Sequence, residues 1–276
     1  MPTNKKYAIG LSLLIIFSAC EEVPEFQEEE SAPVVQAYLY AGEPVDDVRL
    51  TELVPFVSDV EEVPVITDAE IAIISEGNRY SLSPASELEG TYRYEGEDLI
   101  IASGSTYGLE FSYQGELITA ETTVPFPPEE AQISQSAISV PQILTRRDLL
   151  QIRDSFSETI DVTWDNDEGE YYYVLIENLE ANPEPIDVNN SLPRQFSFVS
   201  EPTQENIFPL RLFVHYQQYG LHRVRLFRVN EEYANLYESL EQDSRNLNEP
   251  FSNVRNGLGI FTGFAYDEVY FEVKKP

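Results

Sequence analysis

Several residue types are scarce in this sequence of 276 residues, which contains one cysteine, one tryptophan and two histidines. A single cysteine excludes an intrachain disulfide, and no Gly-x-Ser-x-Gly elbow of the serine hydrolases occurs. Basic residues are also few, with 17 lysines and arginines against 49 aspartates and glutamates, for a formal net charge of -32. Such a field repels phosphate backbones, so the composition argues against nucleic-acid binding.

A long apolar run is missing as well. The segment from Tyr7 to Ala19 is apolar but has only thirteen residues, whereas a helix needs about 20 residues to cross a bilayer. Lys5 and Lys6 precede this segment, and small residues stand directly before Cys20. The layout predicts a bacterial lipoprotein signal peptide over residues 1–19, with lipidation of Cys20 after cleavage. The other interpretation is an ordinary secretory signal in which the cysteine is incidental.

An acidic segment follows the cysteine. Residues 21–30 carry six carboxylates and no basic side chain, and a block of like charges repels itself and stays extended. We therefore expect residues 20–33 to form an acidic tether between a lipid anchor and a folded body.

The segment 34–124 has the pattern of a β-sandwich, because short strand-like runs alternate with turn residues. Glu76–Gly77 and Gln114–Gly115 mark two hairpin turns, since glycine tolerates a positive φ. The predicted strands cover residues 34–40, 47–53, 69–74, 79–83, 90–94, 106–113 and 116–124.

Three prolines fall within residues 125–130, and this stiff segment is predicted to link two domains. In the second domain, residues 131–276, a single amphipathic helix is predicted over residues 231–247, between a possible cap at Asn230 and the helix-breaking Pro250. The predicted strands there cover residues 131–138, 159–165, 170–177, 195–199, 207–216, 221–229 and 269–273. The predicted fold class is mainly β, with an N-terminal immunoglobulin-like β-sandwich followed by a second β-rich domain.

Three further segments carry a family resemblance: residues 33–38, residues 107–111 with 122–125, and residues 250–261. With the cysteine and the acids behind it, they make the chain resemble the Bacteroidota outer-membrane lipoproteins that contain the domain of unknown function 4249. The resemblance covers nearly the whole chain after Cys20. The chain departs from the family at Gln36–Ala37, where members often have a valine–glycine step, which affects only the detail of the first strand.

The resemblance implies a protein anchored to the outer membrane by lipid and accessory to a TonB-dependent receptor barrel. The acidic run after Cys20 resembles the signal that Bacteroidota use to move lipoproteins to the cell exterior. The family has no established reaction, so the resemblance supplies neither catalytic residues nor a cofactor, and no cofactor is expected.

Basic side chains gather near one predicted hairpin of the second domain. They are Arg211, Arg223, Arg225 and Arg228, with His215 and His222 beside them. One interpretation pairs the arginines with carboxylates and places the histidines in the core or at the surface. The alternative is a patch that contacts an anionic ligand or a partner. Two histidines without a placed carboxylate do not predict a metal site.

Two glycine-containing segments are candidates for a ligand or metal site. Asn256, Gly257 and Gly259 do not have the spacing of a dinucleotide loop, so they predict either a tight turn with close backbone packing or a loop facing a ligand. Residues 165–170 resemble half of a calcium loop but lack its later ligands. A hairpin turn between residues 162–164 and 171–174 is the expectation there.

No motif names a reaction, and we expect a non-catalytic binding or accessory component of a nutrient-import system. The first alternative is a structural or adhesion lipoprotein. The second is a cell-surface hydrolase, because two of the 49 acids could form a catalytic pair about 5 to 9.5 Å apart. The single tryptophan, Trp164, gives little support for glycan binding.

Overall fold

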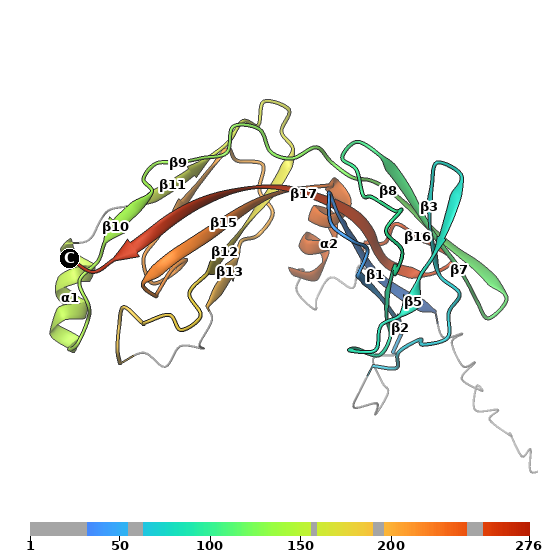
Figure 1. Ribbon diagram of the computed structural model, residues 1–276, viewed down its shortest axis with the longest axis horizontal. Helices are drawn as coiled ribbons and strands as arrows, with labels where there is room; N and C mark the ends of the chain where they lie inside the picture. The colour runs from blue at the N-terminus through green and yellow to red at the C-terminus, as the bar shows by residue number, and fades with distance from the viewer. Residues whose placement is uncertain (1–31, 55–62, 156–158, 190–195, 242–250) are drawn as a thin grey trace, which may run out of the picture. The chain divides into compact units, whose positions relative to one another are not determined.

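The computed structural model of the protein describes residues 32–54, 63–155, 159–189, 196–241 and 251–276 (Figure 1). The predicted signal peptide, Cys20 and most of the acidic tether lie outside these ranges, as do residues 242–247 of the predicted helix. None of the helices within these ranges is long and apolar enough to cross a membrane.

The fold is mainly β, as predicted, and its strands form three sheets. The largest sheet has nine strands. In spatial order its main path runs through β13 (Ser197–Val199), β12 (Tyr171–Asn178), β15 (Gly220–Val229), β17 (Leu258–Lys274), β1 (Pro33–Tyr40), β2 (Asp47–Glu52), β6 (Thr91–Arg93) and β5 (Ser83–Pro84), while β10 (Ala137–Ser139) also pairs with β17.

Two smaller sheets each cover part of the large one. The five-stranded sheet has the order β16 (Val254–Arg255), β8 (Glu116–Thr123), β7 (Thr106–Tyr113), β3 (Ala72–Ser75) and β4 (Asn78–Ser81). The three-stranded sheet has the order β14 (Ile207–Leu210), β11 (Ile160–Thr163) and β9 (Gln132–Ile133). The predicted linker, residues 125–130, lies between β8 and β9 and contains no strand or helix.

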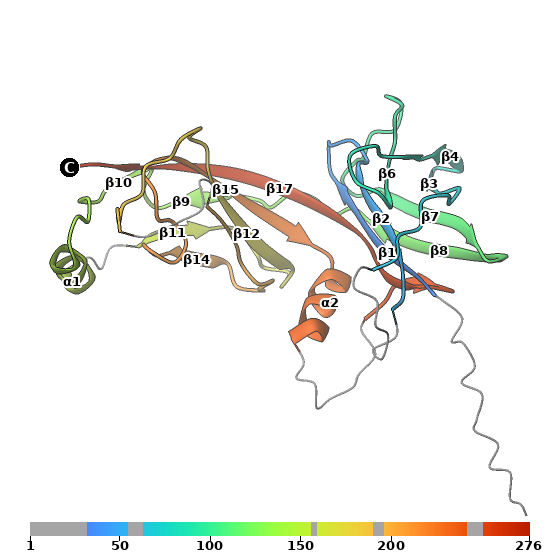
Figure 2. The same ribbon diagram turned by 90° about the horizontal axis from the view of Figure 1, so that it is seen from below.

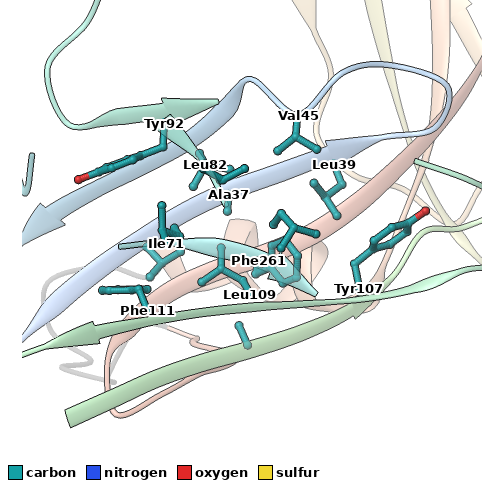
Figure 3. Close-up of a cluster of buried hydrophobic side chains, with 14 of the residues drawn as sticks. Ala37, Leu39, Val45, Ile71, Leu82, Tyr92, Tyr107, Leu109, Phe111 and Phe261 are labelled. Carbon is teal, nitrogen blue, oxygen red and sulfur yellow. The ribbon is translucent and has the colours of Figure 1, made fainter. Parts of the chain in front are cut away.

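The first sandwich forms where the five-stranded sheet packs on β1, β2 and β6 (Figure 3). Side chains alternate between the two faces of a strand, so β1 directs Val35, Ala37 and Leu39 into this core while the residues between them face the other way. Both predicted hairpins are present as β3–β4 and β7–β8.

The second sandwich forms where the three-stranded sheet packs on β12, β15 and the end of β17. Its core includes Trp164, Tyr172 and Phe271. A helix, α1 (Arg146–Ser155), adds Ile152 to this core. Helix α1 was not predicted, and in place of the strand predicted over residues 131–138 the structure has the two short strands β9 and β10.

Strand β17 belongs to both sandwiches (Figures 1 and 2). It pairs in parallel with β1 along its first half and antiparallel with β15 along the rest. Phe261 and Phe271 point to the same face because an even number of positions separates them, yet Phe261 is buried in the first core and Phe271 in the second. The prediction for this strand, residues 269–273, found only its end.

The opposite face of the large sheet carries an aromatic cluster that includes Tyr173, Phe227 and Phe264. Helix α2 (Glu231–Glu241) lies against this cluster (Figure 2), with the Tyr233 ring 5.1 Å from the Phe264 ring and 5.8 Å from the Tyr173 ring, centroid to centroid. The described part of the predicted helix is therefore present and packs on the sheet as its apolar stripe predicted.

Candidate functional site

A hollow of about 580 Å³ lies at the margin of the second sandwich. It is lined by β13, β14 and the chain that joins them. Arg211 and His215, which follow β14, and Tyr237, which belongs to α2, complete the lining. Strand β13 ends the nine-stranded sheet and β14 ends the three-stranded sheet, so the hollow opens between the edges of the two layers. We call this hollow the edge groove.

His215 forms part of the floor of the edge groove. Its ring packs against Phe198 and Phe208, at centroid distances of 4.5 and 5.1 Å, and the residue is 3 % exposed. Its Nδ1 accepts a hydrogen bond from the Arg211 backbone N–H at 2.8 Å. Burial, with the nearby charge of Arg211, lowers the pKa of His215 to about 4, so the ring is neutral at pH 7.

The walls of the edge groove are apolar and open to solvent. Val199 of β13, Ile207 of β14 and Val214 are 56, 44 and 47 % exposed. Exposed apolar side chains are common singly, but three around one hollow form the kind of surface that marks an interaction site.

Arg211 is the cation of the edge groove and is exposed. Within the described ranges, no carboxylate forms an ion pair with its guanidinium, although Glu201 and Glu205 also line the hollow. An arginine in this state can bind a carboxylate of a partner through two parallel hydrogen bonds.

The other three arginines of the predicted patch are paired. Arg223 and Arg225 both bind Oε2 of Glu177, at 3.0 and 2.8 Å, on the face of the sheet that carries the aromatic cluster. Arg225 also lies over the rings of Phe227 and Tyr266. The structure therefore separates these two arginines from Arg211, and they take the pairing that the first interpretation expected.

Arg228 lies on the other face of β15 and binds Glu170 Oε1 at 2.7 Å. Both residues line a second hollow, of about 200 Å³, with the acidic residues of the loop 165–170. The hairpin prediction for this loop was wrong, because β11 before it belongs to the three-stranded sheet and β12 after it to the nine-stranded sheet. Among the described residues, no group of three or more histidine, cysteine or acidic side chains is placed to hold a metal ion.

His222 lies in the second core and not in the edge groove. Its ring stacks on Phe271 at 4.8 Å, its Nδ1 donates to the Gly220 carbonyl at 3.0 Å, and its Nε2 accepts from the Asn178 amide at 3.3 Å. Burial lowers its pKa to about 4. His215 and His222 thus have different ring partners.

Asn256 and Gly257 form the turn from β16 into β17, and Gly259 lies in β17 opposite Val35. Asn256 has a φ of 57° and donates from its side chain to the Leu117 carbonyl at 2.9 Å. Gly259 has a φ of 101°, and a Cβ there would lie 1.9 Å from the Val35 carbonyl oxygen. The close pairing of β17 with β1 therefore requires this glycine.

Sequence reasoning missed the apolar residues of the edge groove, Phe198, Val199, Phe208 and Val214. Each falls in a predicted strand, so the alternation of side chains was available as a signal. The sequence held no signal that the edges of two separate sheets would meet at these residues.

A family model described as "Domain of unknown function (DUF4249)" matches residues 21–269. The chain belongs to this family. The resemblance found in the sequence is thereby confirmed for the DUF4249 domain, and the edge groove lies within the matched range.

Two solved structures are similar to this DUF4249 chain at 10 % identity. The crystal structure of chicken CNTN1 FN1-FN3 domains has a TM-score of 0.26, with 87 % of this chain and 64 % of that chain covered. The crystal structure of domains A168-A170 from titin has a TM-score of 0.19, with 73 % and 61 % covered. The DUF4249 chain thus spans less than two thirds of either one. A search of curated proteins gives no match.

Proposed function

We propose that the protein is a lipid-anchored outer-membrane protein on the exterior of a bacterium of the Bacteroidota. In this proposal it is a non-catalytic binding component of a TonB-dependent import system and contacts its partner or ligand through the edge groove. Cys20 carries the anchor, and residues 21–33 hold the folded body away from the membrane.

The edge groove is the observation that supports the binding role in this proposal, while the anchor and the import system rest on the sequence resemblance. It combines exposed apolar walls at Val199, Ile207 and Val214 with an arginine that has no ion pair among the described residues. Such a combination favours recognition of an apolar partner that also bears an anionic group.

The hydrogen bond and the lowered pKa of His215 support a binding role for the edge groove over a catalytic one. A general base needs a free nitrogen within reach of a substrate and a pKa near the working pH. The Nδ1 of His215 is occupied by the Arg211 N–H, and burial holds the pKa of the ring near 4. The neutral ring therefore packs as part of the floor of the edge groove, against Phe198 and Phe208.

The proposal is tested in detergent extracts of outer membranes that contain the protein with a C-terminal tag. We expect mass spectrometry to find an acylated Cys20 at the amino terminus and a receptor barrel in the tagged eluate. The Cys20→Ser variant is the matched control, and it should leave the membrane fraction.

Two results would contradict the proposal. An unacylated amino terminus would remove the anchor, and repeated isolation of the acylated protein without a barrel would remove the import role. Loss of cell attachment with unchanged nutrient uptake, after deletion of the gene, would favour the structural or adhesion alternative.

A further inference from the structure

We infer that the edge groove accepts an extended polypeptide segment, which adds a strand to β13 and places a carboxylate side chain on Arg211. This inference rests on the proposed function, because it names the kind of partner that the binding component recognises. The partner is a chain of alternating apolar and polar residues with one acidic residue among them.

Within the described residues, no strand covers the outer edge of β13, which is three residues long. Natural sheets guard their edges with proline, charged side chains or a covering element. The opposite end of the nine-stranded sheet, β5, contains Pro84, and β14 across the groove contains Pro209. Strand β13 has neither a proline nor a charge, and its Val199 is 56 % exposed.

The hydrogen bonds of the neighbouring strands show which amides face outward. The Ser200 N–H donates to the Val174 carbonyl at 2.9 Å, and β12 pairs Leu175 with Val199. Bonded and non-bonded pairs alternate along an antiparallel ladder, so the N–H and C=O of Val199 point away from β12. The described residues place no strand on that side.

The hollow beside this edge suits the side chains of an added strand. Alternate side chains of the new strand would point toward the edge groove, where Phe198, Phe208 and Ile207 form apolar walls. Its volume of about 580 Å³ falls within the usual range of ligand sites, roughly 300 to 1,000 Å³. Backbone pairing supplies affinity in this mode of recognition, and the pocket supplies specificity.

Arg211 determines the charge of the partner segment. The chain provides carboxylates for Arg223, Arg225 and Arg228, and an acidic side chain of the partner would do the same for Arg211. Glu201 and Glu205 lie in the same hollow, so they disfavour a segment with several acids and favour a single carboxylate.

The test uses the purified full-length chain and three fluorescent seven-residue peptides. The first alternates valine with threonine and has a central aspartate. The second has asparagine in place of the aspartate, and the third has the aspartate with alternate backbone amides methylated. Anisotropy measures binding, and hydrogen exchange follows the amide of Val199.

We expect the aspartate peptide to bind and to slow exchange at Val199, with the methylated peptide at least about tenfold weaker because it cannot pair as a strand. The asparagine peptide should be about fivefold to tenfold weaker, because Arg211 loses a charge-assisted hydrogen bond. In the Arg211→Gln variant the two unmethylated peptides should bind alike.

Two lysine variants separate strand addition from a simple loss of folding. Val199→Lys guards the edge with a charge and should abolish binding. Leu117→Lys, at a residue that is 54 % exposed on β8 of the first sandwich, is the matched control and should bind as the parent does. Circular dichroism confirms that both variants fold.

Equal binding of the methylated and unmethylated peptides would overturn the inference, as would no detectable binding of the aspartate peptide at millimolar concentration. Neither result would change the outcome of the test of the proposed function, which is whether Cys20 is acylated and whether a receptor barrel is present in the tagged eluate. Conversely, an unacylated amino terminus on the native protein would overturn the proposed location, and peptide binding by that same protein would leave the inference about β13 intact.

Discussion

The two sandwiches differ in what they bury. The first core is almost entirely apolar, and its buried hydroxyl of Tyr92 is satisfied by the Ile66 carbonyl at 2.9 Å. The second sandwich buries His215, His222, Asn178 and Gln218, although a buried polar group costs free energy unless it is paired. Both hollows described above also belong to it. In the proposed function, the second sandwich holds the recognition surface and the first sandwich supports it.

The sharpest way to break this comparison is to damage the first core and observe the second. Phe261 is fully buried in the first core, and Phe261→Ala should lower the free energy of unfolding by about 3–5 kcal/mol. Because β17 joins the cores, the fluorescence of Trp164, which lies in the second core, should report the full loss in a urea titration.

Phe126→Ala, at a residue that is 62 % exposed, is the control and should leave the midpoint nearly unchanged. A Trp164 transition that stays at the parent midpoint in Phe261→Ala would show that the two sandwiches unfold independently.

The junction of the two sandwiches can be tested at its tightest point. Gly259→Ala places a Cβ 1.9 Å from the Val35 carbonyl oxygen at a φ of 101°, and we expect a loss of about 3 kcal/mol or more. Gly115→Ala, at a φ of 88° with open space around it, should cost about 1 kcal/mol. If chemical denaturation gave the same loss of free energy for Gly259→Ala and Gly115→Ala, β17 would be able to move away from β1 without a cost in stability.

The two buried histidines, both in the second sandwich, predict that the free energy of unfolding depends on pH. The pKa of His215 and of His222 is about 4 in the folded chain, below the ordinary value of 6.5. As the pH falls below about 6.5 the unfolded chain takes up protons first, so stability is complete above that pH and is lost progressively toward pH 4.

We expect a loss of up to about 3 kcal/mol for each histidine between pH 7 and pH 4. Urea unfolding at several pH values gives the free energy of unfolding of the parent and of His222→Gln. The difference between the two at each pH isolates the contribution of His222, because the many exposed acids contribute equally to both. An unchanged difference across this range would show that His222 is not held neutral by burial.

The smallest expected effect concerns the ion pairs, which differ in exposure between the two sandwiches. Burial raises the pKa of Glu177, but hydrogen bonds from Arg223 and Arg225 outweigh this and hold it below its usual value. Glu177→Gln should cost about 1 kcal/mol. Glu87 pairs with Arg93 at an exposed place in the first sandwich, and Glu87→Gln should have no measurable effect on the urea midpoint. If Glu87→Gln lowered the free energy of unfolding as much as Glu177→Gln, the exposed and the half-buried ion pair would contribute equally to stability.

The sequence predicted the strands of the first sandwich well, because each has alternating side chains and its hairpins have glycine turns. The prediction failed at β17 because glycine weakens a strand, so the pattern of residues 257–263 favours a tight turn with close backbone packing or a loop facing a ligand. In the structure Gly259 is the residue that lets β17 approach β1. Such a close approach depends on a partner far away in the chain, which no local pattern reveals.

Helix α1 could have been found. Thr145 and Asp148 form a capping box, in which the Thr145 N–H donates to Asp148 Oδ2 at 2.8 Å and the Asp148 N–H donates to Thr145 Oγ1 at 3.3 Å. A threonine followed three residues later by an acid is a sequence signal for a helix start. The edge groove could not be found in this way, because it depends on where two sheets end.

The parallel pairing of β1 with β17 also has a consequence for the timing of folding. These strands come from opposite ends of the described sequence, and contacts between distant residues slow folding because the chain must close a long loop first. A growing polypeptide cannot complete its first core until Phe261 has been synthesised. The nascent chain therefore lacks a complete first core through most of translation.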